Sequence, residues 1–357
     1  MTVRMLLAVD DSKSARVAAS VMKVMQPPVD LLVLHVVDVA RYQHPSMPPR
    51  LSRDYYGRVR DCLVDLAYDL LEKIKASLPQ DLKSIETSVV VGDPVKTILE
   101  TAKRYNPDLL VLGSRGLGYV QEWLVGSVSY HVASQASCPV LVIKRPIKKL
   151  RKVLLGYDGS DDADRAADFL AREVFQEPVE VTIATVWPKP PALPPAVKAD
   201  AKFFLETVKA AAAELVEKVR QHLPVARYKT SAEVVEGEPG KVLVRLATER
   251  ESDLVIVGSR GLSRVKRVFL GSVSHTILHK APCAVLVVKG QDVHQEEKMP
   301  ASAKKARDGE KERSPDEWRD CLICGKPAGE SICEHCKIIV QAEALAQKRK
   351  IEKGGGG

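Results

Sequence analysis

The sequence contains the same pattern twice, and this duplication constrains the fold more than any other feature. The segment GSVSYHVASQASCPVLVIK at 126–144 aligns with GSVSHTILHKAPCAVLVVK at 271–289. At the same offset, NPDLLVLGSRGL at 106–117 aligns with ESDLVIVGSRGL at 251–262. A repeat of this length is a duplicated domain rather than a unit of a solenoid. The chain should therefore contain two domains of one fold.

Each copy alternates short apolar runs with stretches of helical periodicity, such as 13–25, 52–78 and 94–105. The chain is 45% hydrophobic but only 5% aromatic, so its cores must be aliphatic, as expected for strands buried on both faces. We predict an α/β fold with two tandem five-stranded parallel sheets, each flanked by helices. The predicted strands are 3–9, 30–37, 85–91, 108–112 and 139–143 in the first copy, and 152–157, 179–186, 230–235, 253–257 and 284–288 in the second.

The repeat pattern places the two domains at 1–146 and 150–289. Residues 290–319 are charged, mixed in sign and poor in aliphatic side chains, which predicts a flexible linker. A small cysteine-rich module follows at 320–340, and a basic helix with a glycine tail at 341–357 completes the predicted organisation.

The formal net charge is +8, but the basic residues are spread along the chain and interleaved with acidic ones. This distribution favours an ordinary basic protein over a nucleic-acid-binding one. The seven cysteines are an odd number and four of them cluster near the C-terminus, which argues against a disulfide framework and predicts a cytoplasmic protein. No apolar run approaches the roughly 20 residues that a bilayer requires, so we expect no membrane partner.

A glycine-rich loop follows a strand and precedes a helix in each copy: GSRGLGYVQEWLVGS at 113–127 and GSRGLSRVKRVFLGS at 258–272. Such a loop lies at the carboxyl edge of a parallel sheet, where open α/β sheets bind ligands. Glycines let backbone amides approach an anion and allow positive φ. The start of the next helix offers N–H groups and a dipole that favour a phosphate. The alternative is that the glycines only serve tight turns.

The spacing of glycine, two residues, glycine, nine residues, glycine and serine resembles the ATP-binding motif of the universal stress protein family. The segments VDDS at 9–12 and YDGS at 157–160 resemble the same family. The resemblance covers residues 1 to about 289 and implies a tandem universal stress protein of the ATP-binding subgroup. It implies a fold similar to the adenine nucleotide α-hydrolases, ATP or AMP as the ligand, together with Mg²⁺, and a regulatory role in a stress response.

The resemblance also implies which residues contact the ligand. Asp10 and Asp158 match the family aspartate near the adenosine moiety, and Val36 and Val186 match the contacts to adenine. The ribose and phosphate contacts implied are Gly113, Gly116, Gly126, Ser127 and Val128 in the first copy, and Gly258, Gly261, Gly271, Ser272 and Val273 in the second.

The two glycine loops differ in charge. The second carries Arg264, Lys266 and Arg267 between its glycines, whereas the first carries Glu122 and no cation in that span. Cations beside phosphates add affinity. We therefore hypothesise that the second copy binds the nucleotide more tightly.

Four cysteines near the C-terminus, Cys321, Cys324, Cys333 and Cys336, form two Cys-x-x-Cys pairs. This spacing suits four thiolates around one tetrahedral Zn²⁺ and resembles a zinc ribbon. A fragment this small has almost no core, so a metal would stabilise it. The alternative is a pair of redox-active or unligated dithiols. A closed four-cysteine site is structural, so its expected purpose is to dock a protein or nucleic-acid partner.

Two functional classes remain open at this point. The first is a nucleotide-binding regulatory protein, and the second is a weak ATP hydrolase or an adenylyl-transfer enzyme. The sequence contains no Walker lysine after its glycines and no evident pair of nucleophile and base, so we assign no catalytic residue. By resemblance to family dimers, the copies should pack as an internal pseudo-dimer through 139–143 and 284–288, and a homodimer is a further option.

Overall fold

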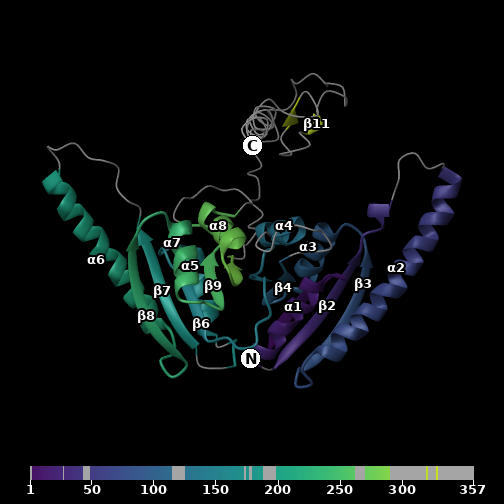
Figure 1. The fold of residues 1–357 in the computed structure, drawn as a ribbon, viewed down its shortest axis with the longest axis horizontal. Coiled ribbons are helices and arrows are strands. Elements are labelled where there is room, and N and C mark those ends of the chain that lie inside the picture. The colour runs from purple at the N-terminus through teal and green to yellow at the C-terminus, as the bar shows by residue number, and fades with distance from the viewer. Residues whose placement is uncertain are drawn as a thin grey trace, which may run out of the picture. The chain divides into compact units, whose positions relative to one another are not determined.

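A computed structural model describes most of the two repeats (Figure 1). It divides the chain into two compact units, Met1–Asp292 and Val293–Gly357. In the second unit the structure describes only two short strands. The described residues are 2–26, 28–42, 49–114, 125–172, 174–176, 179–187, 198–261, 270–289, 319–320 and 327–328.

The first repeat forms a parallel sheet in the order β3-β2-β1-β4-β5. Its strands are β1 (Val3–Val9), β2 (Val29–Val37), β3 (Ser84–Val91), β4 (Leu109–Gly113) and β5 (Val140–Ile143). Its helices are α1 (Lys13–Ala19), α2 (Pro49–Ser77), α3 (Pro94–Tyr105) and α4 (Ser127–Gln135), with the 3₁₀ helices η1 (Ser20–Val24) and η2 (Val39–Tyr42).

The second repeat forms the corresponding parallel sheet in the order β10-β9-β6-β7-β8. Its strands are β6 (Lys152–Gly156), β7 (Val179–Trp187), β8 (Tyr228–Glu236), β9 (Leu254–Gly258) and β10 (Ala284–Val288). Its helices are α5 (Asp161–Ala171), α6 (Lys198–His222), α7 (Pro239–Glu249) and α8 (Ser272–Lys280). The α/β prediction and the ten predicted strands are confirmed, with ends that differ by up to two residues.

The two sheets join because β5 pairs antiparallel with β10, with Val142 opposite Val285 and Leu141 opposite Leu286. The ten strands of the two repeats therefore form one sheet that is parallel except at this seam. β3 and β8 lie at its two edges. Residues far apart in the sequence thus meet in one continuous hydrogen-bonded layer.

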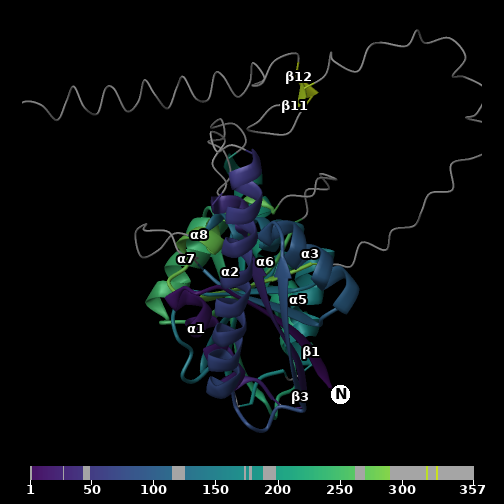
Figure 2. The same cartoon turned by 90° about the vertical axis from the view of Figure 1, so that its right-hand side faces the viewer.

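Helices cover both faces of this sheet because alternate strand residues point to opposite sides. On one face, Leu7 belongs to a buried cluster that includes side chains of α1, α2, α5 and α6. On the other face, its neighbour Leu6 belongs to a cluster with α3, α4, α7 and α8. Figure 2 shows α2 in front of the first sheet, where it packs on β2 and β3.

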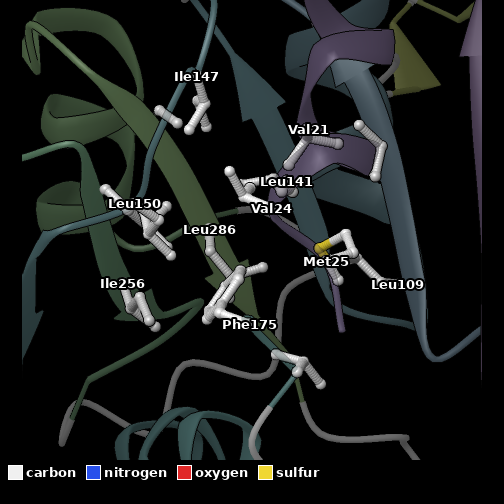
Figure 3. Packing of buried hydrophobic residues seen from close by; sticks show 14 of the residues in the cluster. Val21, Val24, Met25, Leu109, Leu141, Ile147, Leu150, Phe175, Ile256 and Leu286 are labelled. Carbon is white, nitrogen blue, oxygen red and sulfur yellow. The ribbon is translucent and has the colours of Figure 1, made fainter. Parts of the chain in front are cut away.

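The core is shared between the repeats. Figure 3 shows Val24 and Met25 of the first repeat in the same cluster as Phe175 and Leu286 of the second. The backbone also joins here, because the amide of Gln26 donates to the carbonyl oxygen of residue 174 at 2.9 Å. Packing and hydrogen bonds both bind one repeat to the other.

The predicted helix over 13–25 is wrong in one respect, because it divides into α1 and η1. Ser12 starts α1, since its hydroxyl accepts from the amide of Ala15 at 3.3 Å. Ser20 then donates its hydroxyl to the carbonyl oxygen of Val17 at 2.6 Å. Such back-bonding by serine bends or ends helices, which explains the change to a 3₁₀ turn.

The second unit contains β11 (Arg319–Asp320) and β12 (Pro327–Ala328), which pair antiparallel. The linker predicted at 290–319 lies almost wholly outside the described residues, and the four clustered cysteines also lie outside them. None of the described helices combines the length and apolar character that a membrane span requires.

Candidate functional site

The first candidate site begins where β1 ends. Asp10 follows Val9, and its carboxylate accepts hydrogen bonds from the amide of Ser12 at 3.2 Å and from the hydroxyl of Ser12 at 2.5 Å. These bonds hold the half-buried carboxylate in the turn that leads into α1. Asp10 therefore lies at the carboxyl edge of the sheet, as the sequence predicts.

The matching site of the second repeat brings two predicted residues together. The carboxylate of Asp158 accepts from the amide of Ser160 at 3.0 Å. A Cβ atom on Gly261 would lie only 2.6 Å from Oδ2 of Asp158. The missing side chain of Gly261 therefore allows the glycine loop to lie against this carboxylate.

The glycines that end β4 and β9 permit a close approach of helix to strand. A Cβ atom on Gly113 would lie 2.6 Å from the carbonyl oxygen of Ser14, at the start of α1. A Cβ atom on Gly258 would lie 2.8 Å from the carbonyl carbon of Asp162, at the start of α5. We expected glycines of the loops to adopt positive φ. This expectation is wrong for Gly113, Gly258 and Gly261. The described glycines with positive φ are Gly159 and Gly237.

The helices that follow the glycine loops begin without a side-chain cap. Gly126 is the N-cap of α4 and Gly271 is the N-cap of α8, and neither helix start has a capping side chain. Ser127 and Ser272, the first helical residues, are exposed. The first amides of a helix have no partner within it, so these two starts can accept an anion. The prediction that helices begin here is confirmed.

Two serines that the sequence reasoning missed position these helix starts. Ser129 donates its hydroxyl to the carbonyl oxygen of Gly113 at 2.7 Å, and Ser274 donates to that of Gly258 at 2.6 Å. Both belong to the repeated tetrapeptide GSVS, which was the available signal. They fix the distance between the end of the strand and the start of the following helix.

The four valines predicted near the ligand lie at the margin of one core cluster. Val36, Val128, Val186 and Val273 are partly buried and pack on the face that holds α3, α4, α7 and α8. Each repeat thus brings a strand-end valine and a helix-start valine to the same face. An apolar surface of this kind can flank a purine.

The two sites differ at the position beside the strand-end carbonyl. In the first repeat, Nδ1 of His35 lies 2.9 Å from the carbonyl oxygen of Val9. In the second, the hydroxyl of Thr185 donates to the carbonyl oxygen of Tyr157 at 2.8 Å. Burial lowers the pKa of His35, although Val9, Asp10 and Asp11 oppose this shift. The first site therefore contains an imidazole held towards its neutral form.

A family model described as the universal stress protein family matches residues 1–144 and, a second time, residues 149–289. This chain belongs to the universal stress protein family. A universal stress protein of Mycobacterium tuberculosis is 30% identical over 277 residues, which cover 73% of this chain and 88% of that protein. A universal stress protein of Thermus aquaticus is 32% identical over 142 residues, which cover 39% of this chain and 98% of that protein. One repeat therefore corresponds to a whole protein of the shorter kind.

The fold of the paired universal stress protein repeats also matches a solved structure. The crystal structure of a universal stress protein from Archaeoglobus fulgidus superposes with a TM-score of 0.53 at 24% identity. The match covers 80% of this chain and 98% of that one. It shows that two such repeats in one chain are a known arrangement of this fold.

Several predicted residues of these universal stress protein repeats lie outside the described residues. They are Gly116 and Glu122 in the first loop, Arg264, Lys266 and Arg267 in the second, and Cys321, Cys324, Cys333 and Cys336. Within the described ranges, no group of three or more His, Cys, Asp or Glu side chains could hold a metal ion. The zinc site therefore stays a prediction from the cysteine spacing.

Proposed function

We propose that this universal stress protein binds an adenine nucleotide, ATP or AMP, in each repeat, and that it acts as a regulatory protein. One observation carries the proposal: both glycine loops end in an uncapped helix start that is tied to the strand end. The amide of Gly126 donates to the carbonyl oxygen of Ser114 at 2.7 Å, and that of Gly271 donates to Ser259 at 2.8 Å. The first-turn amides of α4 and α8 then remain for a phosphate.

Each group at the site has a proposed role. The carboxylates of Asp10 and Asp158 accept a hydrogen bond from the ribose, and Val36 and Val186 flank the adenine. The helix starts bind the phosphates. Mg²⁺, if it enters with ATP, would be held mainly by phosphate oxygens and water, which is the usual binding mode of this ion.

Two matched variants test the phosphate sites, Ser127→Asp and Ser272→Asp. A carboxylate at the first helical residue stabilises the helix but repels a phosphate. We expect isothermal titration calorimetry to show two binding events per chain for the unchanged protein and one for each variant. The double variant should show none, while the three variants unfold at midpoints no lower than that of the unchanged protein. Binding that survives in the double variant would exclude these helix starts as the phosphate sites.

We propose that the nucleotide is a ligand rather than a substrate. The carboxylates Asp10 and Asp158 already accept hydrogen bonds from Ser12 and Ser160, which suits a positioning role. Incubation with ATP should therefore release little ADP or AMP on the timescale of binding. Turnover that is lost in the double variant would favour the hydrolase or adenylyl-transfer alternative.

We also propose that Cys321, Cys324, Cys333 and Cys336 bind one Zn²⁺ and that this module docks a protein or nucleic-acid partner. The strands β11 and β12, which flank the first cysteine pair in the sequence, pair antiparallel, and this pairing supports the proposal. Metal analysis should find about one zinc ion per chain. The variant Cys333→Ser should lose it, whereas Cys62→Ser, which changes an exposed free thiol, should retain it.

The remaining proposals concern assembly and location. We propose that the repeats form an internal pseudo-dimer, which the β5–β10 pairing supports. Lysines reinforce the seam from both sides, because Lys144 donates to the carbonyl oxygen of Ala281 at 2.8 Å and Lys289 donates to that of Ser134.

A cytoplasmic location is consistent with the free, buried thiols of Cys138 and Cys283. Burial raises their pKa values to about 11 and about 12, so they are inert core residues.

A further inference from the structure

The start of α5 carries a buried carboxylate that the first repeat lacks. Asp162 is 4% exposed and lies beneath the second glycine loop. The corresponding residue at the start of α1 is Ser14, since Asp10 and Ser12 align with Asp158 and Ser160. A buried carboxylate needs donors for its oxygens, and its surroundings show what it holds.

The carboxylate of Asp162 joins α5 to the loop that follows β9. Its Oδ2 accepts from the hydroxyl of Ser259 at 2.6 Å, from the amide of Arg260 at 3.2 Å and from Nε of Arg260 at 3.4 Å. Its Oδ1 accepts from Nη1 of Arg165 at 2.8 Å. The guanidinium groups of Arg165 and Arg260 offset the negative charge of the Asp162 carboxylate.

A second residue of the same turn holds the other side of Arg260. Ser160 donates its hydroxyl to the carbonyl oxygen of Arg260 at 3.2 Å. Both the amide and the carbonyl of this residue are thus fixed by the start of α5. The next residue is Gly261, which lies against Asp158. Asp158, Ser160 and Asp162, at alternate positions, together set the path of the loop from Gly258 to Gly261.

In the described part of the first repeat, Ser114 receives no hydrogen bond equivalent to the one between Asp162 and Ser259. Ser114 is 3% exposed and aligns with Ser259. Among the residues that the structure describes, no hydrogen bond joins the side chain of Ser14 to that of Ser114. A serine hydroxyl is also shorter than a carboxylate and offers one oxygen instead of two. The repeats therefore differ in this contact between the start of the helix and the start of the loop.

From this difference we infer that Asp162 is a positioning residue that orders the start of the second glycine loop, residues 258–261, before ligand binds, so that the second repeat binds the phosphates of the nucleotide more tightly. The inference rests on the proposed function. A loop already in its bound path loses less conformational freedom on binding. This source of unequal affinity is independent of the cations in the second loop.

The test isolates each site with the blocking variants. In the Ser127→Asp background, which leaves the second site, Asp162→Ser should weaken ATP binding by about tenfold in calorimetry. Asp162→Asn keeps one acceptor for Ser259 but loses the charge that pairs with arginine, so it should give a smaller loss. In the Ser272→Asp background, which leaves the first site, neither change should alter ATP affinity. A general loss of stability would weaken both sites, so the contrast separates positioning from folding.

Hydrogen exchange measures the ordering directly and without ligand. The amide of Arg260 should exchange at least about tenfold faster in Asp162→Asn than in the unchanged protein, while the amides of β4 keep their rates. Unchanged exchange of this amide, or unchanged ATP affinity at the second site, overturns the inference. If the unchanged protein binds neither ATP nor AMP, the proposed function fails and the affinity claim fails with it. The exchange experiment then still decides whether Asp162 orders the loop.

Discussion

The space around single glycines decides how closely the strands and helices of each repeat approach. Gly113 leaves no room for a methyl group, because the backbone of Ser14 would lie within 2.7 Å of its Cβ. Gly57, the ninth residue of α2, has no atom within 4 Å of the same position apart from the nearby backbone of its own helix. A side chain therefore has no room at Gly113 but has room at Gly57, although both glycines lie in regular secondary structure.

We predict opposite effects for alanine at these two positions. Gly113→Ala must push backbone away from backbone and should lower the unfolding free energy by about 1–3 kcal/mol. Gly57→Ala should raise it by about 0.5–1 kcal/mol, because alanine loses less entropy in a helix than glycine does. Urea unfolding of both variants beside the unchanged protein checks the pair. Equal effects at the two sites would contradict the close approach of α1 to β4.

Two partly buried imidazoles make the stability depend on pH. Burial lowers the pKa of His35 and of His279 from the ordinary value of 6.5. The unfolded chain therefore takes up these protons more readily than the folded protein. The stability that the neutral rings provide is complete above pH 6.5 and is lost as the pH falls below 6.5 towards the folded pKa values.

The variant His35→Thr tests this pH dependence, because it copies the residue that the second repeat uses, Thr185. We expect the unfolding free energy of the unchanged protein to fall between about pH 8 and about pH 5, and the fall to be smaller in the variant. The difference between the two slopes isolates His35 from other titrating groups. If the unfolding free energy fell more steeply with pH in His35→Thr than in the unchanged protein, the pKa of His35 would be raised by folding rather than lowered.

Among the elements, the third helix of each repeat shows how one methylene group changes a cap. Asp93 is the N-cap of α3, and its carboxylate accepts from the amide of Lys96 at 2.8 Å. The same position before α7 is Glu238, whose side chain makes no capping hydrogen bond. Glu238 instead pairs with Lys241 on the surface, an interaction that contributes little.

A pair of substitutions at these caps should change stability in opposite directions. Asp93→Ala should lower the unfolding free energy by about 0.5–2 kcal/mol, which is the usual cost of losing an N-cap. Glu238→Asp should raise it, because the shorter side chain can reach the first-turn amides of α7. Thermal unfolding of the two variants measures both changes. A loss of stability in Glu238→Asp would show that the pairing with Lys241 outweighs the cap.

Strands and most helices could be predicted from the sequence because their signals are local. The apolar run at 3–9 and the Gly-Ser pair at 126–127 each mark one element by their own residues. The division of α1 from η1 was missed, because it depends on the hydroxyl of Ser20 bonding to its own backbone. Periodicity alone does not report such a bond.

The parts of the site that escaped prediction depend on distant partners. Asp162 reads as an ordinary acidic residue in the first turn of a helix, and its partner Ser259 lies 97 residues away. The pairing of β5 with β10 was expected only from the resemblance to family dimers. The apolar pattern of a strand does not indicate which other strand it pairs with. Gly113 and Gly258 lie at the ends of β4 and β9, where they serve close packing rather than positive φ.

At the scale of the whole molecule, the two repeats should fold and unfold together. They share a sheet and a core, and Phe175, which is 2% exposed, packs in the cluster that crosses between them (Figure 3). Its backbone also bridges to Met25. Neither repeat keeps its full core when the other unfolds.

We therefore predict one unfolding transition for residues 1–289. Differential scanning calorimetry should give a single peak for the repeats whose calorimetric and van't Hoff enthalpies agree. Phe175→Ala should shift this peak without splitting it, because removal of a buried phenylalanine costs about 3–5 kcal/mol and the loss is shared. Two separate peaks in the variant would show that the repeats fold independently.

Because β5 and β10 belong to one chain, their pairing is independent of dilution. A tether replaces a bimolecular encounter with a very high local concentration, so the halves stay joined at any level of expression. The two repeats, and with them the two proposed binding sites, are then always delivered in a ratio of one to one. A cell that contains few copies of this protein would still hold complete pairs. Under the proposed function, each pair would report two ranges of nucleotide concentration at once.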